Sequence, residues 1–269
     1  NNLGRSINVM SDKLERTINQ LRNSNIELEK DIEEKSKIDE MRKSFISDVS
    51  HELKTPIALI QGYSEGLLEN VNTDEESRKF YAEVILDETN KMDKLVKQLL
   101  ELMKLEYGKR QFNDKKFNIV EVEKEVVRKS KVMLEEKKVK IEFNLSEEIN
   151  VFADDFYIEQ VISNYITNAI KHVKEIDGKK VISIVNEVNI EKNKVRVKIF
   201  NTGENIAEEH INRIWNRFYK VDESRNRTDG GTGIGLSFVK AIMNNYGNRY
   251  GVTNKEDGVE FYFDLDLIV

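Results

Sequence analysis

Apolar residues follow a helical spacing through the first third of the chain. They recur in steps of four and three, and a polar Asn25 lies in the same seam. After Ile32 the apolar positions shift by one residue relative to the earlier heptads, which changes supercoil winding. The pattern predicts one long helix and leaves two interpretations open, a solvated linker helix or a dimerising, signal-passing coil. The seam positions before the shift are Leu14, Ile18, Leu21, Asn25, Leu28 and Ile32.

A second helix is predicted after the polar break ENVNTDEES (69–77). Thr73 and Glu76 are spaced as a capping box, and Gly108 is placed to end the helix. Two helices joined by a short break predict an antiparallel hairpin. Neither helix can bury its apolar stripe alone, so two hairpins should pair into a four-helix bundle, most simply in a homodimer.

The pattern changes from Phe112 onward. Short alternating runs at 139–143, 181–185, 195–200 and 259–265 predict strands, and helical periods at 119–138, 155–172 and 234–246 lie between them. Strands mixed with helices predict a two-layer α/β sandwich, with one sheet covered on one face. The chain therefore divides near residue 110 into a helical part and a mixed part.

Composition narrows the possible functions. The net charge of −6 gives no basic footprint, so nucleic acid is not expected as the main partner. Cysteine is absent, which excludes disulfides and thiolate metal sites. The sequence has no signal-peptide pattern and no apolar run near the roughly 18 residues that span a bilayer. Since it does not begin with methionine, we expect a piece of a longer protein.

The segment SHELKTPIALI (50–60) holds the only proline. His51 lies about 200° around the helix from the apolar face, so its imidazole should meet solvent. Glu52 is adjacent and can accept a proton, and Thr55 lies on the same face as His51. Pro56 removes the hydrogen bond to the Glu52 carbonyl. This defect is either a tolerated kink or a hinge beside a reactive histidine.

Three further segments suggest a nucleotide site. Asn164, Asn168 and Lys171 share one face of a predicted helix, and amide oxygens beside an ammonium suit Mg²⁺ with phosphate. NTGENI (201–206) follows a strand, and GGTGIGL (230–236) opens a helix whose amides can face an anion. The basic run 215–229 between them reads as a lid.

Together these segments resemble the conserved boxes of bacterial two-component sensor histidine kinases. SHELKTP is similar to the phospho-acceptor box, NYITNAIKH to the N box, NTGENI to the first glycine box, RFYKVD to the F box and GGTGIGL to the second glycine box. All five occur in the family's order. A weaker likeness links the first residues to the end of a HAMP linker, and a faint one links the chain to the vancomycin-resistance sensors of Gram-positive bacteria.

The resemblance implies a phosphotransfer hairpin followed by an ATP-binding domain of the GHKL type. It implies residues 1–36 as the C-terminal part of a HAMP domain with a coiled-coil linker, 37–108 as the dimerisation and phosphotransfer hairpin, and 112–269 as the catalytic domain. The implied enzyme is an ATP-dependent protein-histidine kinase that works with Mg²⁺. The implied partners are a second copy and the receiver domain of a response regulator, at the cytoplasmic face of the bacterial membrane. That membrane would be reached only through upstream segments, and the regulator would itself be DNA-binding.

The resemblance also implies residue roles. His51 would take the phosphoryl group, Glu52 would be the general base, and Thr55 would help place water when the kinase acts as a phosphatase. Asn168 would hold Mg²⁺. The other nucleotide-contacting positions would be Asn164, Lys171, His172, Asn201, Gly203, Ile206, Phe218, Lys220, Arg225, Gly231, Thr232, Gly233, Gly235 and Leu236.

Two departures from the family pattern bear on activity. The first glycine box commonly reads DxGxGI, but here Asn201 replaces the aspartate and Asn205 the second glycine. Asn201 can still accept from the adenine amino group, without charge assistance. Two alternatives therefore stand beside the kinase: a degenerate, non-catalytic dimeric scaffold, and an ATPase of the gyrase or mismatch-repair type, against which the histidine-bearing hairpin argues.

Overall fold

The structure is a computed structural model that describes residues 2–71, 74–106, 111–144, 148–221 and 232–268. It divides into two compact units, Asn1–Glu88 and Thr89–Val269, and each is described here by itself. The boundary between the two units falls inside a helix, whereas the sequence pattern predicted the division between the helical and the mixed part near residue 110. Among the described residues, no helix has a stretch both long and apolar enough to cross a membrane.

The first unit is a helical hairpin. Helix α1 (Asn2–Leu68) runs 67 residues without interruption, and α2 (Glu75–Glu106) begins after a short break. The two helices meet near the turn, where the Tyr63 and Tyr81 rings lie edge to face at 4.8 Å. Gly66 allows this approach, because a Cβ there would lie 2.7 Å from the Tyr81 ring. The predicted antiparallel hairpin is confirmed.

The cap of α2 uses a different residue from the predicted one. The Asp74 carboxylate accepts a hydrogen bond from the Ser77 amide at 2.7 Å. This bond is the main reason that the pKa of Asp74 is lowered. Asp74 thus satisfies one of the free amides of the first turn. Thr73, the predicted capping residue, lies outside the described residues.

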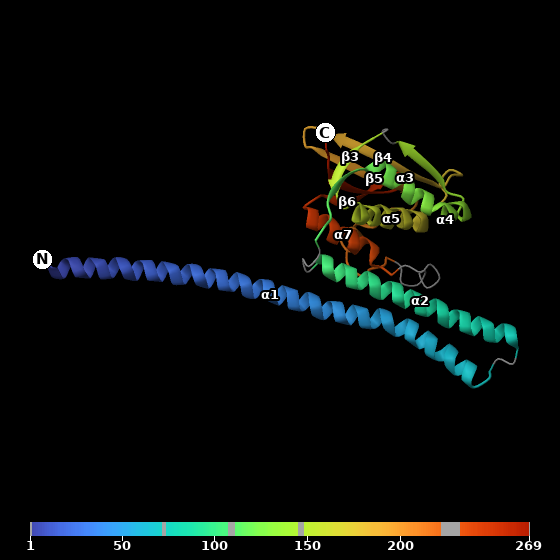
Figure 1. The fold of residues 1–269 in the computed structure, drawn as a ribbon, viewed down its shortest axis with the longest axis horizontal. Helices are drawn as coiled ribbons and strands as arrows, with labels where there is room; N and C mark the ends of the chain where they lie inside the picture. The colour runs from blue at the N-terminus through green and yellow to red at the C-terminus, as the bar shows by residue number, and fades with distance from the viewer. Residues whose placement is uncertain (1, 72–73, 107–110, 145–147, 222–231, 269) are drawn as a thin grey trace. The chain divides into compact units, whose positions relative to one another are not determined.

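The second unit contains a five-stranded mixed sheet in the order β2-β4-β5-β7-β6. Strands β2 and β4 pair in parallel and all other neighbours are antiparallel. Helices α3 (Ile119–Lys129), α5 (Asp155–His172) and α7 (Gly235–Tyr246) cover one face of this sheet (Figure 1). A separate two-stranded ribbon joins β1 (Lys115–Asn118) and β3 (Asn150–Ala153). The sheet strands are β2 (Lys140–Asn144), β4 (Val181–Asn189), β5 (Lys194–Thr202), β6 (Tyr250–Lys255) and β7 (Gly258–Asp266).

The predicted elements of this unit are largely confirmed. Helix α5 (Asp155–His172) has the predicted bounds, and α7 (Gly235–Tyr246) starts one residue later than predicted. The helix predicted over 119–138 is two helices, α3 (Ile119–Lys129) and α4 (Lys131–Glu136), separated at Ser130. Four short elements were not predicted: β1 (Lys115–Asn118), β3 (Asn150–Ala153), α6 (Glu208–Ile211) and β6.

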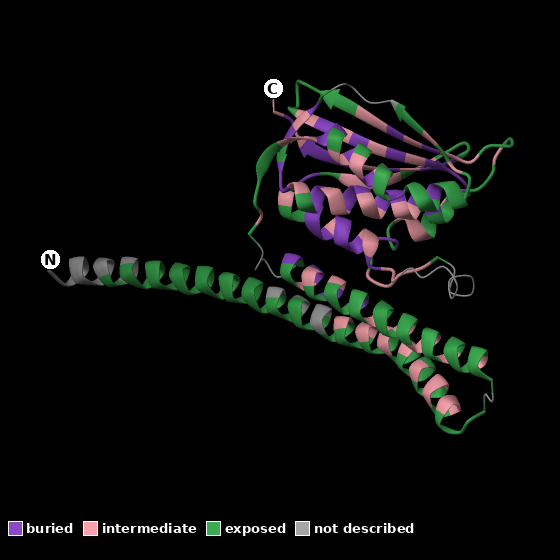
Figure 2. Ribbon diagram, turned by 45° about the vertical axis from the view of Figure 1, so that its right-hand side comes forward, coloured by how far each residue is buried: buried purple, intermediate pink, exposed green. Residues whose placement is uncertain are grey.

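The core lies between the sheet and its helices, where the buried residues concentrate (Figure 2). Strand β5 shows the alternation that a one-sided sheet requires, with Val195, Val197 and Ile199 buried. The second half of α2 belongs to the same unit. Its buried leucines recur every three or four residues, at Leu95, Leu99, Leu102 and Leu105.

One buried polar pair lies beneath α3. Glu123 is fully buried, and its Oε2 accepts from Asn186 Nδ2 at 3.0 Å. Burial raises the pKa of the Glu123 carboxyl from 4.5 to about 7, against the opposing effects of Asn186 and Lys124. The other Glu123 oxygen, Oε1, and the Asn186 side-chain oxygen, Oδ1, are both buried acceptors with no hydrogen-bond partner in the described structure. A proton on Glu123 turns one of these acceptors into a donor, so the pair favours the neutral acid.

This pair predicts a pH dependence of stability. The pKa of Glu123 is higher in the folded than in the unfolded chain, so its contribution is fully present below about pH 4.5 and is lost as pH rises towards 7. Glu123→Gln should remove this slope and stabilise the protein above pH 7 by up to about 3 kcal/mol. Urea unfolding between pH 5 and pH 8 measures the effect. Glu121→Gln, an exposed site on the same helix, should keep the wild-type slope. An unchanged slope in Glu123→Gln would contradict the assignment.

Candidate functional site

The first half of the candidate site lies on α1. His51 and Thr55 are exposed and Glu52 is partly exposed, as the helical phase predicted. His51 and Thr55 are four residues apart in an unbroken helix and therefore lie on one face. The imidazole is thus open to a reagent from solvent, with a carboxylate on the adjacent residue.

Pro56 lies inside α1 and does not end it. Its ring nitrogen cannot donate to the Glu52 carbonyl, so one rung of the helical ladder is missing directly beside His51. Both ribbon views show α1 bending over its last third, the part that holds Pro56 (Figures 1 and 2). A bend is the expected response to a missing rung.

The second half of the site is built on α5. Asn164 and Asn168 are partly exposed and Lys171 is exposed, whereas Ile162 and Ile166 on the opposite side are fully buried. Burial of the isoleucines against the sheet fixes the rotation of the helix. The polar stripe is therefore directed away from the core, as predicted from the spacing.

The glycine segment before α7 contacts this stripe. A Cβ on Gly235 would lie 2.6 Å from Asn164 Oδ1, closer than real contacts allow. Asn164 is held from its other end, because its Nδ2 donates to the Gln160 carbonyl at 2.8 Å. The absence of a side chain at Gly235 leaves the Asn164 oxygen free to face the start of α7. Two segments 71 residues apart in sequence thus form one surface.

The predicted F box is joined to the same glycine segment. The Phe218 amide donates to the Gly233 carbonyl at 2.9 Å. A Cβ on Gly233 would lie 2.7 Å from Phe218 Cα, and Gly233 has a φ of +69°. Phe218 itself has a φ of +59°, which is rare for an aromatic residue. The strained backbone of Phe218 therefore lies against the glycine segment, which itself contacts Asn164 on α5.

A third cluster lies at the end of β5. Asn201 is buried, and its Nδ2 donates to the Thr202 carbonyl at 3.1 Å. With the donor so engaged, Asn201 Oδ1 is the group left to accept from a ligand. Gly203 comes close to the end of α5, since a Cβ there would lie 2.8 Å from the His172 carbonyl oxygen. Asn201 and His172 therefore border the same space.

The structure describes most of the remaining predicted positions. Ile206, Lys220, Thr232 and Leu236 are partly exposed. Arg225 and Gly231 lie outside the described residues. The described residues contain no group of three His, Asp or Glu side chains that could hold a metal ion. A cation here would therefore depend on the Asn168 amide oxygen together with oxygens of a bound phosphate chain, a donor set that suits Mg²⁺.

Comparison with known proteins identifies the two halves. Residues 41–108 match the family of His Kinase A (phospho-acceptor) domains. Residues 153–268 match the family of histidine kinase-, DNA gyrase B- and HSP90-like ATPases. The chain belongs to the sensor histidine kinases. The predicted helical hairpin and GHKL-type α/β sandwich are both confirmed.

The chain has relatives among curated and solved proteins. Sensor protein SrrB of Staphylococcus aureus strain N315 is 31% identical over 226 residues, which cover 84% of this chain and 38% of SrrB. The solved Acinetobacter baumannii histidine kinase AdeS is 25% identical, with a TM-score of 0.67, and the match covers 81% of this chain and 98% of that one. Histidine kinase ThkA, solved with response regulator protein TrrA, is 27% identical with a TM-score of 0.62, covering 81% and 60%.

The chain corresponds to only part of its curated relatives, because it spans 38% of the length of the SrrB proteins that it matches. The 153–268 match makes an ATP-binding domain of the second unit. The structure is compatible with a nucleotide bound at this domain, because Gly235 leaves open a space beside Asn164 that a Cβ would fill.

The candidate site also has supporting residues that the sequence pattern did not predict. Asn254 on β6 clamps Ile206 in both directions, accepting from its amide at 2.9 Å and donating to its carbonyl at 2.7 Å. The Thr202 hydroxyl donates to the Lys174 carbonyl at 2.8 Å and ties β5 to the end of α5. Asn254 lies more than 45 residues from the first glycine box, so no local motif could have indicated it.

Further missed contacts join α2 to the glycine segment and α7 within the second unit. The Thr232 hydroxyl donates to Gln98 Oε1 at 3.2 Å, and Asn245 Nδ2 donates to the Leu105 carbonyl at 3.0 Å. Arg217 forms an ion pair with Glu106. The base of the glycine segment is therefore held from the α2 side as well as by Phe218.

The close approach at Gly235 predicts the effect of a single methyl group. Gly235→Ala should displace the Asn164 side chain and lower the affinity for an ATP analogue about tenfold, the loss of about one hydrogen bond to a charged group. Folding stability should change by less than about 1 kcal/mol, because the atom in the way is the end of a side chain. Fluorescent-nucleotide titration and thermal unfolding measure the two effects.

Gly62→Ala is the matched control, because a Cβ there meets nothing within 4 Å. It should leave nucleotide affinity unchanged and favour the helix slightly. Normal nucleotide affinity in Gly235→Ala would contradict the role given to the Asn164 oxygen.

Proposed function

We propose that this chain transfers the γ-phosphoryl group of ATP to His51 and then to an aspartate of a response regulator. The single observation that carries the proposal is an exposed histidine on a phospho-acceptor hairpin, in the same chain as an ATP-binding domain. In the first step a new P–N bond forms on the imidazole and the bond to the ADP oxygen breaks. In the second step the P–N bond breaks as a carboxylate oxygen of the regulator takes the group.

The roles on α1 follow from position. Glu52 is next to His51 and accepts the imidazole proton, acting as the general base. Thr55 shares the face of His51 and orients water in a separate phosphatase activity, in which water hydrolyses the phosphorylated aspartate of the regulator and releases phosphate. The bend at Pro56 lies directly beside these residues and serves as a hinge, which lets His51 meet the ATP-binding domain or the regulator in turn.

The nucleotide roles follow the three clusters around α5. Asn168 holds Mg²⁺, while Asn164 and Lys171 support the phosphates. Asn201 accepts from the adenine amino group, with His172, Gly203 and Ile206 around the base. The glycine segment and F box close the phosphate end through Phe218, Lys220, Arg225, Gly231, Thr232, Gly233, Gly235 and Leu236. When bound, Mg²⁺ neutralises phosphate charge during transfer.

A homodimer is the proposed assembly. The seam residues of α1 are exposed in the single chain, with Leu14 at 62%, Leu21 at 61% and Ile32 at 65% exposure. A row of large apolar side chains at heptad spacing is stabilised when a second copy covers it. We assign residues 1–36 to the end of a HAMP domain and its linker, 37–108 to the hairpin and 112–269 to the catalytic domain. The kinase would act at the cytoplasmic face of the membrane.

The competing function is a non-catalytic dimeric scaffold. Asn201 and Asn205, which replace residues of the first glycine box, favour it. The orientation of Asn201 weighs against it, because the hydrogen bond to Thr202 leaves an acceptor for adenine.

Transfer of label from γ-labelled ATP decides between the two. The wild-type chain should acquire acid-labile, alkali-stable label, and His51→Gln should acquire none. Absence of label in the wild type, with the ATP analogue bound, would favour the scaffold. Mixing His51→Gln with Asn168→Ala then tests the direction, since label appears only if one subunit phosphorylates the other.

The proposed contact between Asn201 and adenine predicts a separate effect on ATP affinity. Asn201→Ala should lower the affinity for ATP about tenfold, because one buried hydrogen bond to the adenine amino group is lost. Asn205→Ala, which changes an exposed residue of the same box, should bind normally. Calorimetric titration with a non-hydrolysable ATP analogue measures both. Equal affinities in the wild type and in Asn201→Ala would contradict the adenine contact.

A further inference from the structure

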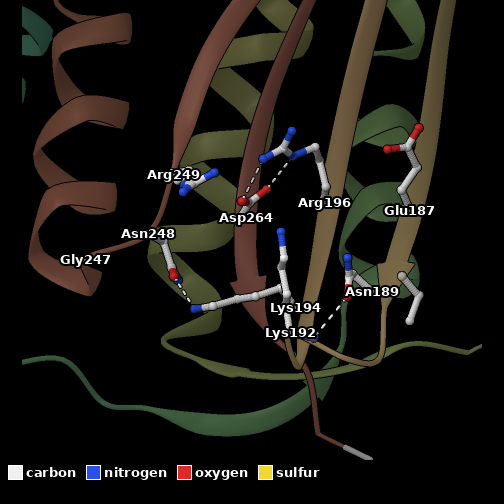
Figure 3. Close-up of a pocket in the computed structure, with 10 residues that line it drawn as sticks. Glu187, Asn189, Lys192, Lys194, Arg196, Gly247, Asn248, Arg249 and Asp264 are labelled. Carbon is white, nitrogen blue, oxygen red and sulfur yellow. Dashed lines mark hydrogen bonds and ion pairs between the residues drawn. The ribbon is translucent and has the colours of Figure 1, made fainter.

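A hollow lies at the other end of β5 from Asn201. It has a volume of about 580 Å³ and is bordered by β4, β5, β7 and the segment Gly247–Arg249 (Figure 3). Lys194 and Asn201 are seven residues apart on one strand, so their backbones are separated by about 23 Å. Lys194 and Arg196 alternate with the buried Val195 and Val197, so the hollow opens on the face that the core does not use. It is therefore distinct from the candidate nucleotide site.

The lining of this hollow is positively charged in a chain whose net charge is −6. Two carboxylates line it, Glu187 and Asp264. Both already have cationic partners. Asp264 binds two nitrogens of Arg196, at 2.7 and 2.9 Å, and Glu187 pairs with Lys198. The four cationic lining residues are Lys192, Lys194, Arg196 and Arg249.

Two of these cations are held in place by their neighbours. Figure 3 shows Arg196 reaching Asp264 and Lys194 reaching Asn248. The Arg196 guanidinium also lies over the Tyr262 ring, 4.3 Å from its centroid. Lys194 is further bound by Asp266 at 2.6 Å. These contacts give the hollow a rigid floor.

The other two cations are available. Lys192 and Arg249 are exposed, and neither side chain has an ion pair or a hydrogen bond within the described part of the chain. They come from separate segments, the β4–β5 turn and the entry to β6, yet line one hollow. The C-terminus of α7, which ends at Tyr246 and is capped by Gly247, opposes an anion weakly through its dipole. Binding should therefore be modest in strength.

We propose that this hollow binds a small, multiply charged oxyanion, either a polyphosphate or a polycarboxylate. Guanidinium and ammonium groups both donate to such oxygens, and the arginine can do so with two N–H groups. The cations gather around one compact hollow instead of forming an extended stripe, which suits a small molecule better than a nucleic acid or a membrane surface. The site is independent of phosphotransfer at His51.

Isothermal titration of the whole chain tests the site. The nucleotide site is first saturated with a non-hydrolysable ATP analogue and Mg²⁺, and pyrophosphate or citrate is then added. We expect one of the two anions to bind with a Kd on the order of 1 mM or tighter. The double variant Lys192→Gln/Arg249→Gln should weaken that binding about tenfold, as two exposed charge contacts predict.

The control removes two exposed lysines elsewhere on the same unit, Lys116→Gln/Lys179→Gln, and makes the same change in net charge. It should bind the anion like the wild type. Pyrophosphate binding alone would identify a phosphate ligand, and citrate binding alone a carboxylate ligand; both support the site. Binding of neither anion, or equal weakening in the two double variants, would overturn it. Unchanged ATP-analogue affinity checks that each variant is folded.

Discussion

The packing of α5 against the sheet is the interaction on which the rest of the ATP-binding unit depends. Its isoleucines are buried against the inner face, where β5 contributes Val197 and Ile199. Burial of each such side chain stabilises the fold by about 1.5–3 kcal/mol, far more than any polar contact that α5 makes at the surface. The apolar face therefore sets the rotation of the helix, and the asparagines are directed outward as a consequence. The geometry of the site follows from the core.

Close backbone approach then joins the remaining parts to α5. Gly203 lies against the end of α5, Gly235 against Asn164, and Gly233 against Phe218. In each case a Cβ would overlap an atom of the neighbouring segment. Glycine weakens a fold through the entropy of the unfolded chain. Here that cost is localised where separate segments must meet around a ligand, and it is offset by the apolar core beneath them.

The phospho-acceptor helix shows the opposite arrangement. None of its side chains that the structure describes is buried in the single chain, and its Pro56 weakens the backbone beside His51. The His51 imidazole is exposed there, beside a helical turn that lacks one backbone hydrogen bond. The second half of α2, by contrast, contributes buried side chains to the ATP-binding unit, among them Leu102 and Leu105. One hairpin thus contains an exposed histidine beside a weakened turn and, further along, a segment that belongs to the core of the ATP-binding unit.

Local pattern was sufficient for the elements whose period matches one buried face. Helix α5, the central strands and the exposure of His51 were predicted because 3.6-residue and two-residue periods report directly on burial. The short elements β1 and β3 were missed, since four residues carry too little period to detect. The break at Ser130 was missed because the apolar pattern continues across it.

The sequence by itself determined the class of the protein, the order of its boxes and the faces on which their side chains lie. Tertiary structure alone decided which distant residues support them. Asn254 clamps Ile206, Gln98 accepts from Thr232, and Lys192 and Arg249 line one hollow. These pairings come from strand order and from the folding back of α2, which bring together residues with no fixed sequence spacing. A side-chain period records burial along one element, but it does not record which element lies opposite.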